Sequence, residues 1–162
     1  MSELHAFSMS VIYAQDLGPL SSKLTSELVS LTEKIFGPGD RLDGTWRIQN
    51  MPDLSSFTAR NGDDLIGFKL GYAVTSQRYY SWLGGVHPSY RRAGIAGELM
   101  RRQHEWISSR GYKVIETEVV QTNHEMSRLN EESGFSVAGV RFDAEHPRVI
   151  YRKRIGQDHD GA

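Results

Sequence analysis

The chain of 162 residues carries a net charge of −1, is 38% hydrophobic and contains no cysteine. This composition is typical of a globular protein, excludes disulfides, thiolate metal sites and a cysteine nucleophile, and argues against a strongly basic nucleic-acid-binding protein. No apolar run reaches the roughly 18 residues that cross a bilayer, and residues 1–10 lack the basic and apolar regions of a signal peptide, so we expect a cytoplasmic protein with neither nucleic acid nor membrane as partner.

Apolar periodicity and turn residues divide the chain into predicted helices and strands. Apolar residues recur every three or four positions from Leu20 to Ile35, which predicts an amphipathic helix. Asn61-Gly62 predicts a hairpin turn whose two central residues have positive φ. Gly84-Gly85 inside a predicted strand indicates a bulge or the close approach of another backbone. The predicted strands are 8–14, 55–60, 65–74, 79–86, 114–120, 136–141 and 149–155, and the predicted helices are 20–35, 40–50, 95–110 and one that begins near residue 122.

The order of these elements predicts a mixed α/β fold. No linker, repeat or low-complexity segment divides the chain, so residues 1–155 are predicted to form one domain, followed by a polar tail at 156–162. Residues 79–120 are predicted to form a strand–helix–strand crossover.

The loop between the strand 79–86 and the helix that begins near Ile95 is the most informative segment. The first N–H groups of a helix lack partners and the helix dipole adds positive charge, so phosphate groups bind at such a place. Gly94 lets the backbone approach a ligand without a Cβ clash. Between Tyr90 and Lys113 the chain has six basic and two acidic residues, which adds positive charge but is also typical of a solvated helix face. From these residues alone, the loop is either an anion-binding turn or an ordinary turn whose small residues serve packing.

Two sequence blocks resemble one known family. The segment Arg91-Arg92-Ala93-Gly94-Ile95-Ala96 fits the pattern Gln/Arg-x-x-Gly-x-Gly/Ala, which is similar to the acyl-CoA signature of the GNAT superfamily of N-acyltransferases. Asn123, followed by Met126, Leu129 and Gly134-Phe135, resembles the second conserved block of that family. The resemblance covers about residues 65–154 and is nearest to small bacterial-type members of unassigned substrate. It implies a mostly antiparallel sheet of about seven strands, with helices on both faces, that is splayed between its two central parallel strands.

The resemblance also implies where acetyl-CoA lies. Backbone N–H groups of the segment 91–96 would hold the pyrophosphate, with added charge from Arg91, Arg92, Arg101 or Arg102. The pantetheine arm would pair with the main chain near Val86 and with the Asn123 side chain. The residues alone favour another role for Asn123, a helix cap, for which Thr122 competes because Thr122 and Glu125 have capping-box spacing. The implied cosubstrate-binding residues are Gly85, Val86, Arg91, Arg92, Ala93, Gly94, Ile95, Ala96 and Asn123.

Glu118 is the candidate catalytic residue. An amine of the lysine type is mostly protonated at neutral pH, so a group must accept its proton before it attacks the thioester. Glu118 lies five residues before Asn123, where some peptide-modifying members of the family carry a glutamate with this role. Glu116 shares its face of the strand, and the alternative is that both carboxylates form salt bridges with nearby Arg or Lys. Asn130 stands where many members have a tyrosine that protonates the leaving thiolate.

The sequence therefore predicts an N-acetyltransferase that moves an acetyl group from acetyl-CoA to a primary amine of a small molecule or peptide. Asn130 keeps open a second class, a non-catalytic acyl-CoA-binding regulatory module on the same fold. An RNA-binding module on the Arg-rich helix is weaker because the segment lacks an aromatic platform. The six histidines have no metal-ligand spacing, so no metal is expected. A homodimer is expected only because the resemblance to this family implies one.

Overall fold

The structure is a computed structural model that describes residues 10–38, 44–142 and 145–156. Within these ranges seven strands form one sheet in the order β1-β2-β3-β4-β5-β7-β6. The strands are β1 (Val11–Leu17), β2 (Ser55–Asn61), β3 (Asp64–Ala73), β4 (Arg78–Val86), β5 (Val114–Val120), β6 (Ser136–Phe142) and β7 (Pro147–Arg154). The helices are α1 (Ser22–Phe36), α2 (Gly44–Asn50), the short 3₁₀ helix η1 (Pro88–Tyr90), α3 (Ile95–Ser109) and α4 (His124–Glu132).

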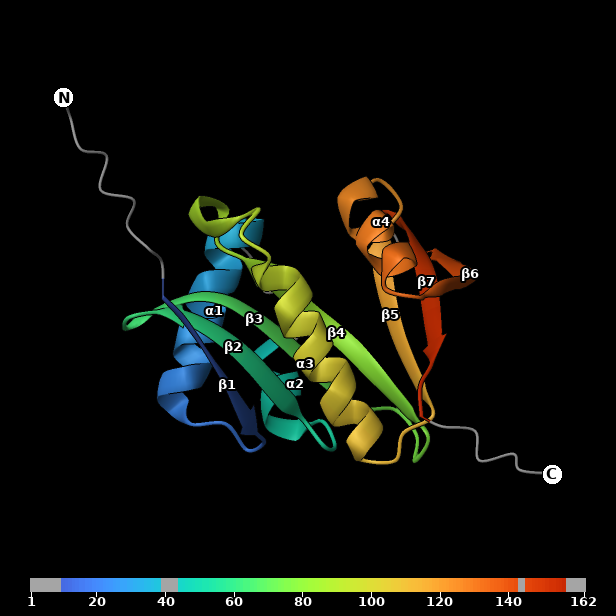
Figure 1. Cartoon of the computed structure of the whole chain (residues 1–162), viewed down its shortest axis with the longest axis horizontal. Helices are drawn as coiled ribbons and strands as arrows, with labels where there is room; N and C mark the ends of the chain where they lie inside the picture. The colour runs from blue at the N-terminus through green and yellow to red at the C-terminus, as the bar shows by residue number, and fades with distance from the viewer. Residues whose placement is uncertain (1–9, 39–43, 143–144, 157–162) are drawn as a thin grey trace.

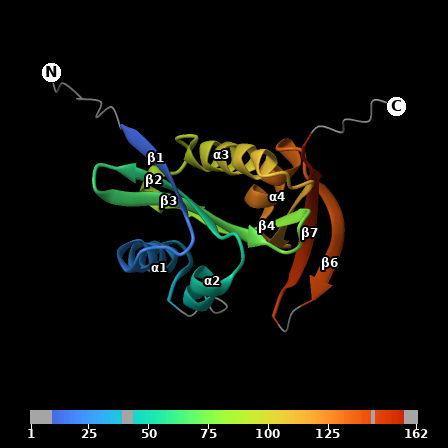
Figure 2. The same ribbon diagram turned by 90° about the horizontal axis from the view of Figure 1, so that it is seen from below.

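The helices cover both faces of the sheet, with α1 and α2 on one face and α3 and α4 on the other (Figure 2). Neighbouring strands are antiparallel except β4 and β5, which are parallel and joined through α3. This arrangement confirms the predicted fold class. The predicted strand 8–14 begins later, at Val11, and continues to Leu17, while residues 8, 9 and 40–43 lie outside the described ranges. No helix in the described ranges is long and apolar enough to cross a membrane.

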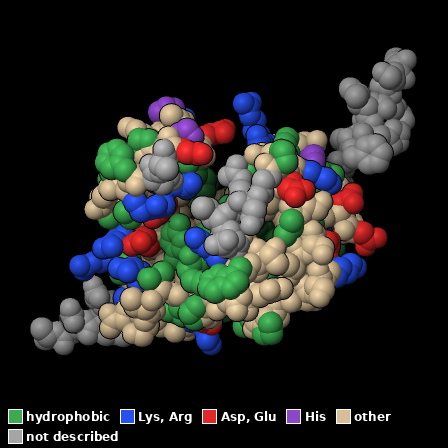
Figure 3. All heavy atoms as spheres, turned by 180° about the vertical axis from the view of Figure 1, so that it is seen from behind, with side chains coloured by type: hydrophobic (Ala, Val, Ile, Leu, Met, Phe, Trp, Pro, Cys, Tyr) green, Lys and Arg blue, Asp and Glu red, His purple; other side chains and the backbone are tan. Residues whose placement is uncertain are grey.

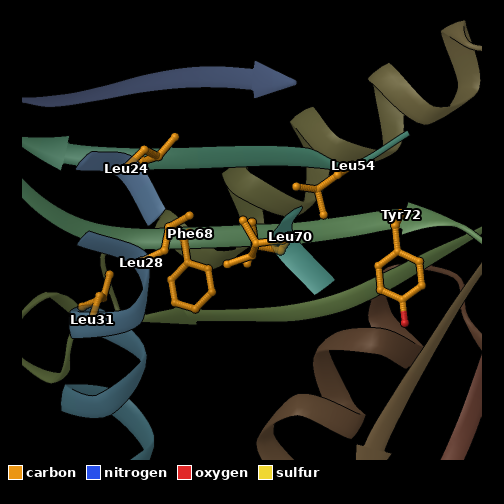
Figure 4. Packing of buried hydrophobic residues seen from close by; sticks show 8 residues of the cluster. Leu24, Leu28, Leu31, Leu54, Phe68, Leu70 and Tyr72 are labelled. Carbon is orange, nitrogen blue, oxygen red and sulfur yellow. The ribbon is translucent and has the colours of Figure 1, made fainter. Parts of the chain in front are cut away.

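Periodicity explains how α1 is held on the sheet. Leu24, Leu28 and Leu31 are buried against Phe68 and Leu70 of β3 (Figure 4). Ser21 caps the helix, because its Oγ accepts a hydrogen bond from the N–H of Leu24 at 3.1 Å. Each buried leucine contributes about 1.5–3 kcal/mol of transfer free energy, so packing rather than helix propensity holds this segment in place.

One local prediction was wrong in detail, and of the two alternatives for Gly84-Gly85 the close approach of another backbone holds, since a Cβ on Gly84 would lie 3.1 Å from the carbonyl oxygen of Phe68. The hairpin between β2 and β3 exists, but Asn61 pairs with Asp64, so the central residues are Gly62 and Asp63 and, of these two, only Gly62 has positive φ. The bulge in β4 does not lie at Gly84-Gly85, which pair regularly with β3. Instead the register shifts opposite Leu70 and Gly71, which pair with Leu83 and Ser81, so Trp82 is the extra residue. The glycines serve close packing, since a Cβ on Gly85 would lie 2.9 Å from Cδ1 of Ile35.

The central strands split apart after a short parallel ladder. Only Arg78 to Tyr80 of β4 pair with Val114 to Glu116 of β5, although both strands continue beyond these residues. One further bond bridges them, from Oγ1 of Thr117 to the carbonyl of Ser81 at 2.9 Å. Beyond it the strands diverge, with α3 beside β4 and α4 beside β5 (Figure 1). We call this gap the β4–β5 split.

Gly71 on β3 provides a test of core packing. A Cβ at this position would lie 2.5 Å from Cε1 of Tyr79 and 2.7 Å from the carbonyl oxygen of Tyr80. Tyr79 cannot retreat easily, because its hydroxyl is bonded to Oγ of Ser55 at 2.6 Å and to the carbonyl of Asp53 at 3.0 Å. We expect Gly71→Ala to lower the free energy of unfolding by about 1–3 kcal/mol in urea titrations.

The matched control is Gly97→Ala in α3, where a Cβ meets nothing within 4 Å. Alanine in a helix interior is favoured over glycine by roughly 0.5–1 kcal/mol, so this variant should be slightly more stable. Equal effects of the two substitutions would contradict the packing described for Gly71.

Candidate active site

The turn before α3 presents unpaired backbone N–H groups. Arg92 has a φ of 65° and Gly94 a φ of 77°, so the chain curls before the helix begins at Ile95. Across the described ranges, no backbone N–H from 91 to 97 donates to a protein carbonyl, and the first that does is that of Glu98, to the carbonyl of Gly94 at 3.1 Å. A Cβ on Gly94 would meet nothing within 4 Å. This turn, together with the helix dipole, can hold an anion.

Side chains of the turn fix its position and supply its charge. Ile95 is buried under the sheet and anchors the start of α3. Nε of Arg91 donates to the carbonyl of Val86 at 3.4 Å, which ties the loop to the end of β4. Arg92, Ala93 and Ala96 are exposed. The basic residues of the turn therefore lie beside its free N–H groups.

Arg101 and Arg102, the other predicted sources of charge for this turn, are both ion-paired with glutamates of α3. Arg101 forms ion pairs with Glu98 at 2.9 Å and with Glu105 at 2.8 Å, and Arg102 pairs with Glu98 at 2.8 Å. The guanidinium of Arg102 also stacks over the ring of Tyr13, 4.6 Å from its centroid. Their charge near the turn is therefore partly balanced by Glu98 and Glu105.

The edge of β4 that faces the split has backbone groups without a strand partner. The ladder to β5 ends at Tyr80, so Gly85 and Val86 pair with β3 alone. The Val86 side chain is buried with Ile95. An extended ligand can therefore pair with this edge as an additional strand does.

Asn123 is the N-cap of α4. Its Oδ1 accepts a hydrogen bond from the N–H of Met126 at 3.2 Å, so the helix-cap interpretation is confirmed and Thr122 is not the cap. The side chain is exposed, and its Nδ2 remains able to donate to a ligand at the end of β5.

Glu118 and Glu116 lie on the opposite face of β5 from α4, and both are ion-paired. Oε2 of Glu118 lies 2.8 Å from Nη2 of Arg141 on β6, and Oε2 of Glu116 lies 2.7 Å from Nε of Arg152 on β7. The salt-bridge alternative is thus what the structure contains. The Glu118 side chain is 14% exposed, so its carboxylate still reaches solvent.

Two tyrosines, Tyr72 and Tyr80, lie close enough to Glu118 to be affected by its charge, and Trp82 packs against Tyr72. The rings of Tyr72 and Tyr80 are 5.4 Å apart, and those of Tyr72 and Trp82 are 5.9 Å apart. Burial first, and then the charge of Glu118, raise the pKa of Tyr80 well above its ordinary value. We call Tyr72, Tyr80 and Trp82 the aromatic wall. Its signal in the sequence was the alternation of Tyr80 and Trp82 on one strand.

Arg47 of α2 completes this wall. Its Nη1 donates to the Tyr72 hydroxyl at 3.1 Å, and its guanidinium lies 5.3 Å from the ring centroid of Trp82. The neighbouring Trp46 is 58% exposed. Beside the wall, a cavity of about 380 Å³ lies between α1, α2 and β4. Figure 3 shows hydrophobic, Lys and Arg side chains side by side on the face opposite α3.

The position expected for a proton donor holds no acid. Asn130 is fully buried, and neither its Oδ1 nor its Nδ2 has a hydrogen-bond partner among the described residues. His87 caps η1, because its Nδ1 accepts from the N–H of Ser89 at 3.1 Å. Within the described ranges, no group of His, Asp and Glu side chains is placed to hold a metal ion.

A seven-stranded sheet that splits between its two parallel strands, followed by a turn with free backbone N–H groups, is the architecture of acyl-CoA-dependent N-acyltransferases. Residues 25–135 match the model of the acetyltransferase (GNAT) family, and the chain belongs to this family. Among curated protein sequences, none is similar enough to match the chain.

Solved structures share the fold at low sequence identity. The ribosomal-protein-S18-alanine N-acetyltransferase of Escherichia coli has a TM-score of 0.80 and 15% identity, over 93% of this chain and 99% of that one. Arabidopsis thaliana NAA60 in complex with acetyl-CoA has a TM-score of 0.77 and 16% identity, over 90% and 99%. The IAA acetyltransferase of Bacillus cereus has a TM-score of 0.73 and 16% identity, over 90% and 100%. The likeness to these proteins concerns the fold.

Proposed function

We propose that this protein transfers an acetyl group from acetyl-CoA to a primary amine of a small molecule or peptide, by direct attack of the amine on the thioester. The observation that carries the proposal is the β4–β5 split, which runs from the anion-binding turn to the aromatic wall. Two similar structures bear on it: one is an alanine N-acetyltransferase, and another was solved with acetyl-CoA.

Acetyl-CoA is the cosubstrate in this proposal. Its pyrophosphate binds the free N–H groups of Arg91, Arg92, Ala93, Gly94, Ile95 and Ala96. The pantetheine arm runs along Gly85 and Val86 on β4 and receives a hydrogen bond from Nδ2 of Asn123. The unpaired N–H groups and the open space at Gly94 suit a bulky anionic ligand.

Glu118 accepts the proton of the attacking amine, directly or through water. Its ion pair with Arg141 holds the carboxylate in place, and the aromatic wall beside it excludes water from one side of the acceptor. The amine enters from the face of α1 and α2, so the two substrates reach the split from opposite faces of the sheet. The predictions of a homodimer, of one domain over 1–155 and of a cytoplasmic location stay predictions.

The experiment is turnover of acetyl-CoA with a panel of primary amines, polyamines, aminoglycosides and peptide N-termini, measured as release of free thiol. The expected result is acceptor-dependent release, with the acetylated product identified by mass spectrometry. The second candidate, a regulatory module, rests on the absence of an acid at Asn130. Tight CoA binding without turnover of any amine would favour that module.

The split also predicts selectivity within the cosubstrate. Adenosine 3′,5′-bisphosphate carries phosphates for the turn but no pantetheine for β4. Because the pantetheine amides gain hydrogen bonds of roughly 0.5–1.5 kcal/mol each, we expect CoA to bind at least about tenfold more tightly. Calorimetry measures both affinities, and equal affinity would contradict the pantetheine path along Gly85 and Val86.

A further inference from the structure

A buried lysine on β3 has no partner. Lys69 is 7% exposed, and among the described residues its ammonium has no hydrogen bond and no ion pair. Burial lowers the pKa of Lys69 to about 8. An unpaired buried ammonium costs folding free energy, so its retention needs a reason.

The Lys69 side chain leans toward the β4–β5 split. Lys69 pairs with Gly84 of β4, and a Cβ on Gly84 would lie 3.3 Å from Cγ of Lys69. Since Gly84 has no side chain, the aliphatic stem of Lys69 lies over it, and the charge of Lys69 acts on His104 of α3. Lys69 therefore faces α3 on the side of β4 that borders the split.

The groups facing Lys69 there are basic or neutral. On α3, Nδ1 of His104 lies 3.4 Å from Nζ of Lys153, which extends from β7. Burial, and then the charges of Lys69 and Lys153, lower the pKa of His104 to about 3, so its ring is neutral at physiological pH. On β4 the facing residue is Gly84, and no carboxylate among the described residues perturbs Lys69. An anion at this end of the split has Lys69 as an available buried partner.

The inward-facing position 130 of α4 holds no acid. Asn130 shares a helix face with Met126, which packs in the same cluster as Met100 of α3 and Phe135. The amide cannot donate a proton as an acid, and among the described residues its two polar atoms have no hydrogen-bond partner. A proton donor for the leaving group must therefore come from a position other than 130.

We propose that Lys69 is the catalytic acid that protonates the sulfur of CoA as it leaves. This inference rests on the proposed acetyl transfer. The amine nitrogen forms a bond to the acyl carbon, the carbon–sulfur bond breaks, and its electron pair goes to sulfur. Nζ of Lys69 gives its proton to that sulfur, which yields the thiol of CoA, while Glu118 takes the proton of the amine. Exchange with water then restores both groups.

The pKa of the Lys69 ammonium and that of the CoA thiol are close to each other. A thiol has a reference pKa of about 8.5 and an ordinary lysine of about 10.4, so burial brings the ammonium close to the sulfur in acidity. General acid catalysis is most effective when the catalytic pKa lies near the working pH. Because the charged form of Lys69 is the donor, activity is expected to fall as the pH rises through about 8.

The test compares wild type with Lys69→Met and Lys69→Arg, and with Lys23→Met on the exposed face of α1 as control. Methionine fills a similar volume without a buried charge, so that variant should fold. Thiol release is measured against pH, and CoA affinity by calorimetry. Both Lys69 variants should lose about 10²-fold in turnover, the low end for general acid catalysis, because a thiolate already leaves readily. Arginine keeps the charge but does not release a proton, so it should not rescue turnover.

A second readout needs no acceptor. The pKa of the bound CoA thiol is followed by the ultraviolet absorbance of the thiolate. A nearby ammonium should lower it by about 1–3 pH units relative to free CoA, and Lys69→Met should abolish this difference. If CoA binds and Lys69→Met leaves the thiol pKa unchanged, or if Lys69→Arg retains full turnover, the assignment of Lys69 fails and acetyl transfer stands. If wild type binds no CoA, the proposed function itself fails.

Discussion

Gly94→Asp is expected to weaken CoA binding by about 10²–10⁴-fold, because the new carboxylate repels the pyrophosphate and blocks the turn. Hydrogen bonds to a charged group contribute about 1.5–3 kcal/mol each, and about 1.4 kcal/mol changes an affinity tenfold. Loss of two such bonds accounts for the expected range. The affinity of purified wild-type and variant protein is measured by calorimetry.

Gly62→Asp is the matched control for this substitution. Gly62 has a φ of 59°, and Gly94 has a φ of 77°, and a Cβ at either position meets nothing within 4 Å. Both variants therefore carry the same added charge in the same left-handed backbone, where aspartate is tolerated, so their stabilities should change alike. Only the Gly94 variant should lose CoA affinity. A folded Gly94→Asp protein with normal CoA affinity would place the pyrophosphate elsewhere.

Glu118→Gln should reduce turnover by about 10²–10⁴-fold while CoA affinity stays nearly unchanged, because the amide cannot accept the proton of the amine. Steady-state kinetics over a range of pH separates this loss from weaker binding. The change also removes the ion pair to Arg141, which is 47% exposed. Exposed pairs contribute only about 0–1 kcal/mol, so the variant should remain folded.

Glu116→Gln is the control for that measurement. Glu116 lies on the same face of β5 and also pairs with an exposed arginine, Arg152. Glu116 lies at the last paired position of the ladder between β4 and β5, whereas Glu118 lies beyond the end of that ladder. The Glu116 variant should therefore lose much less turnover. If the Glu118 variant keeps near-normal turnover and pH profile, water would replace Glu118 as the proton acceptor.

The elements with strong local signals could be predicted from the sequence. The apolar spacing of α1, the strand β5 and the start of α3 at Ile95 all follow from residues close together in the chain. The turn 91–96 belongs to this group, since glycine and a helix start are enough to expose its N–H groups. That it binds an anion stays a prediction. Other local signals were ambiguous. Thr122 and Asn123 both suit a helix cap, and in the structure the cap of α4 is Asn123.

Contacts between distant strands were decided only by the tertiary structure. Glu118 meets Arg141 because β7 lies between β5 and β6 in space, and no local pattern encodes that order. The bulge lies at Trp82 rather than at the predicted glycines. The register of β3 and β4 depends on how both strands pack between two helical layers, which no local pattern encodes. Lys69 alternates with apolar Phe68 and Leu70, which in a one-sided sheet would indicate a solvated lysine. Since helices cover both faces here, the alternation places Lys69 under α3, where only the fold makes it a buried and unpaired charge.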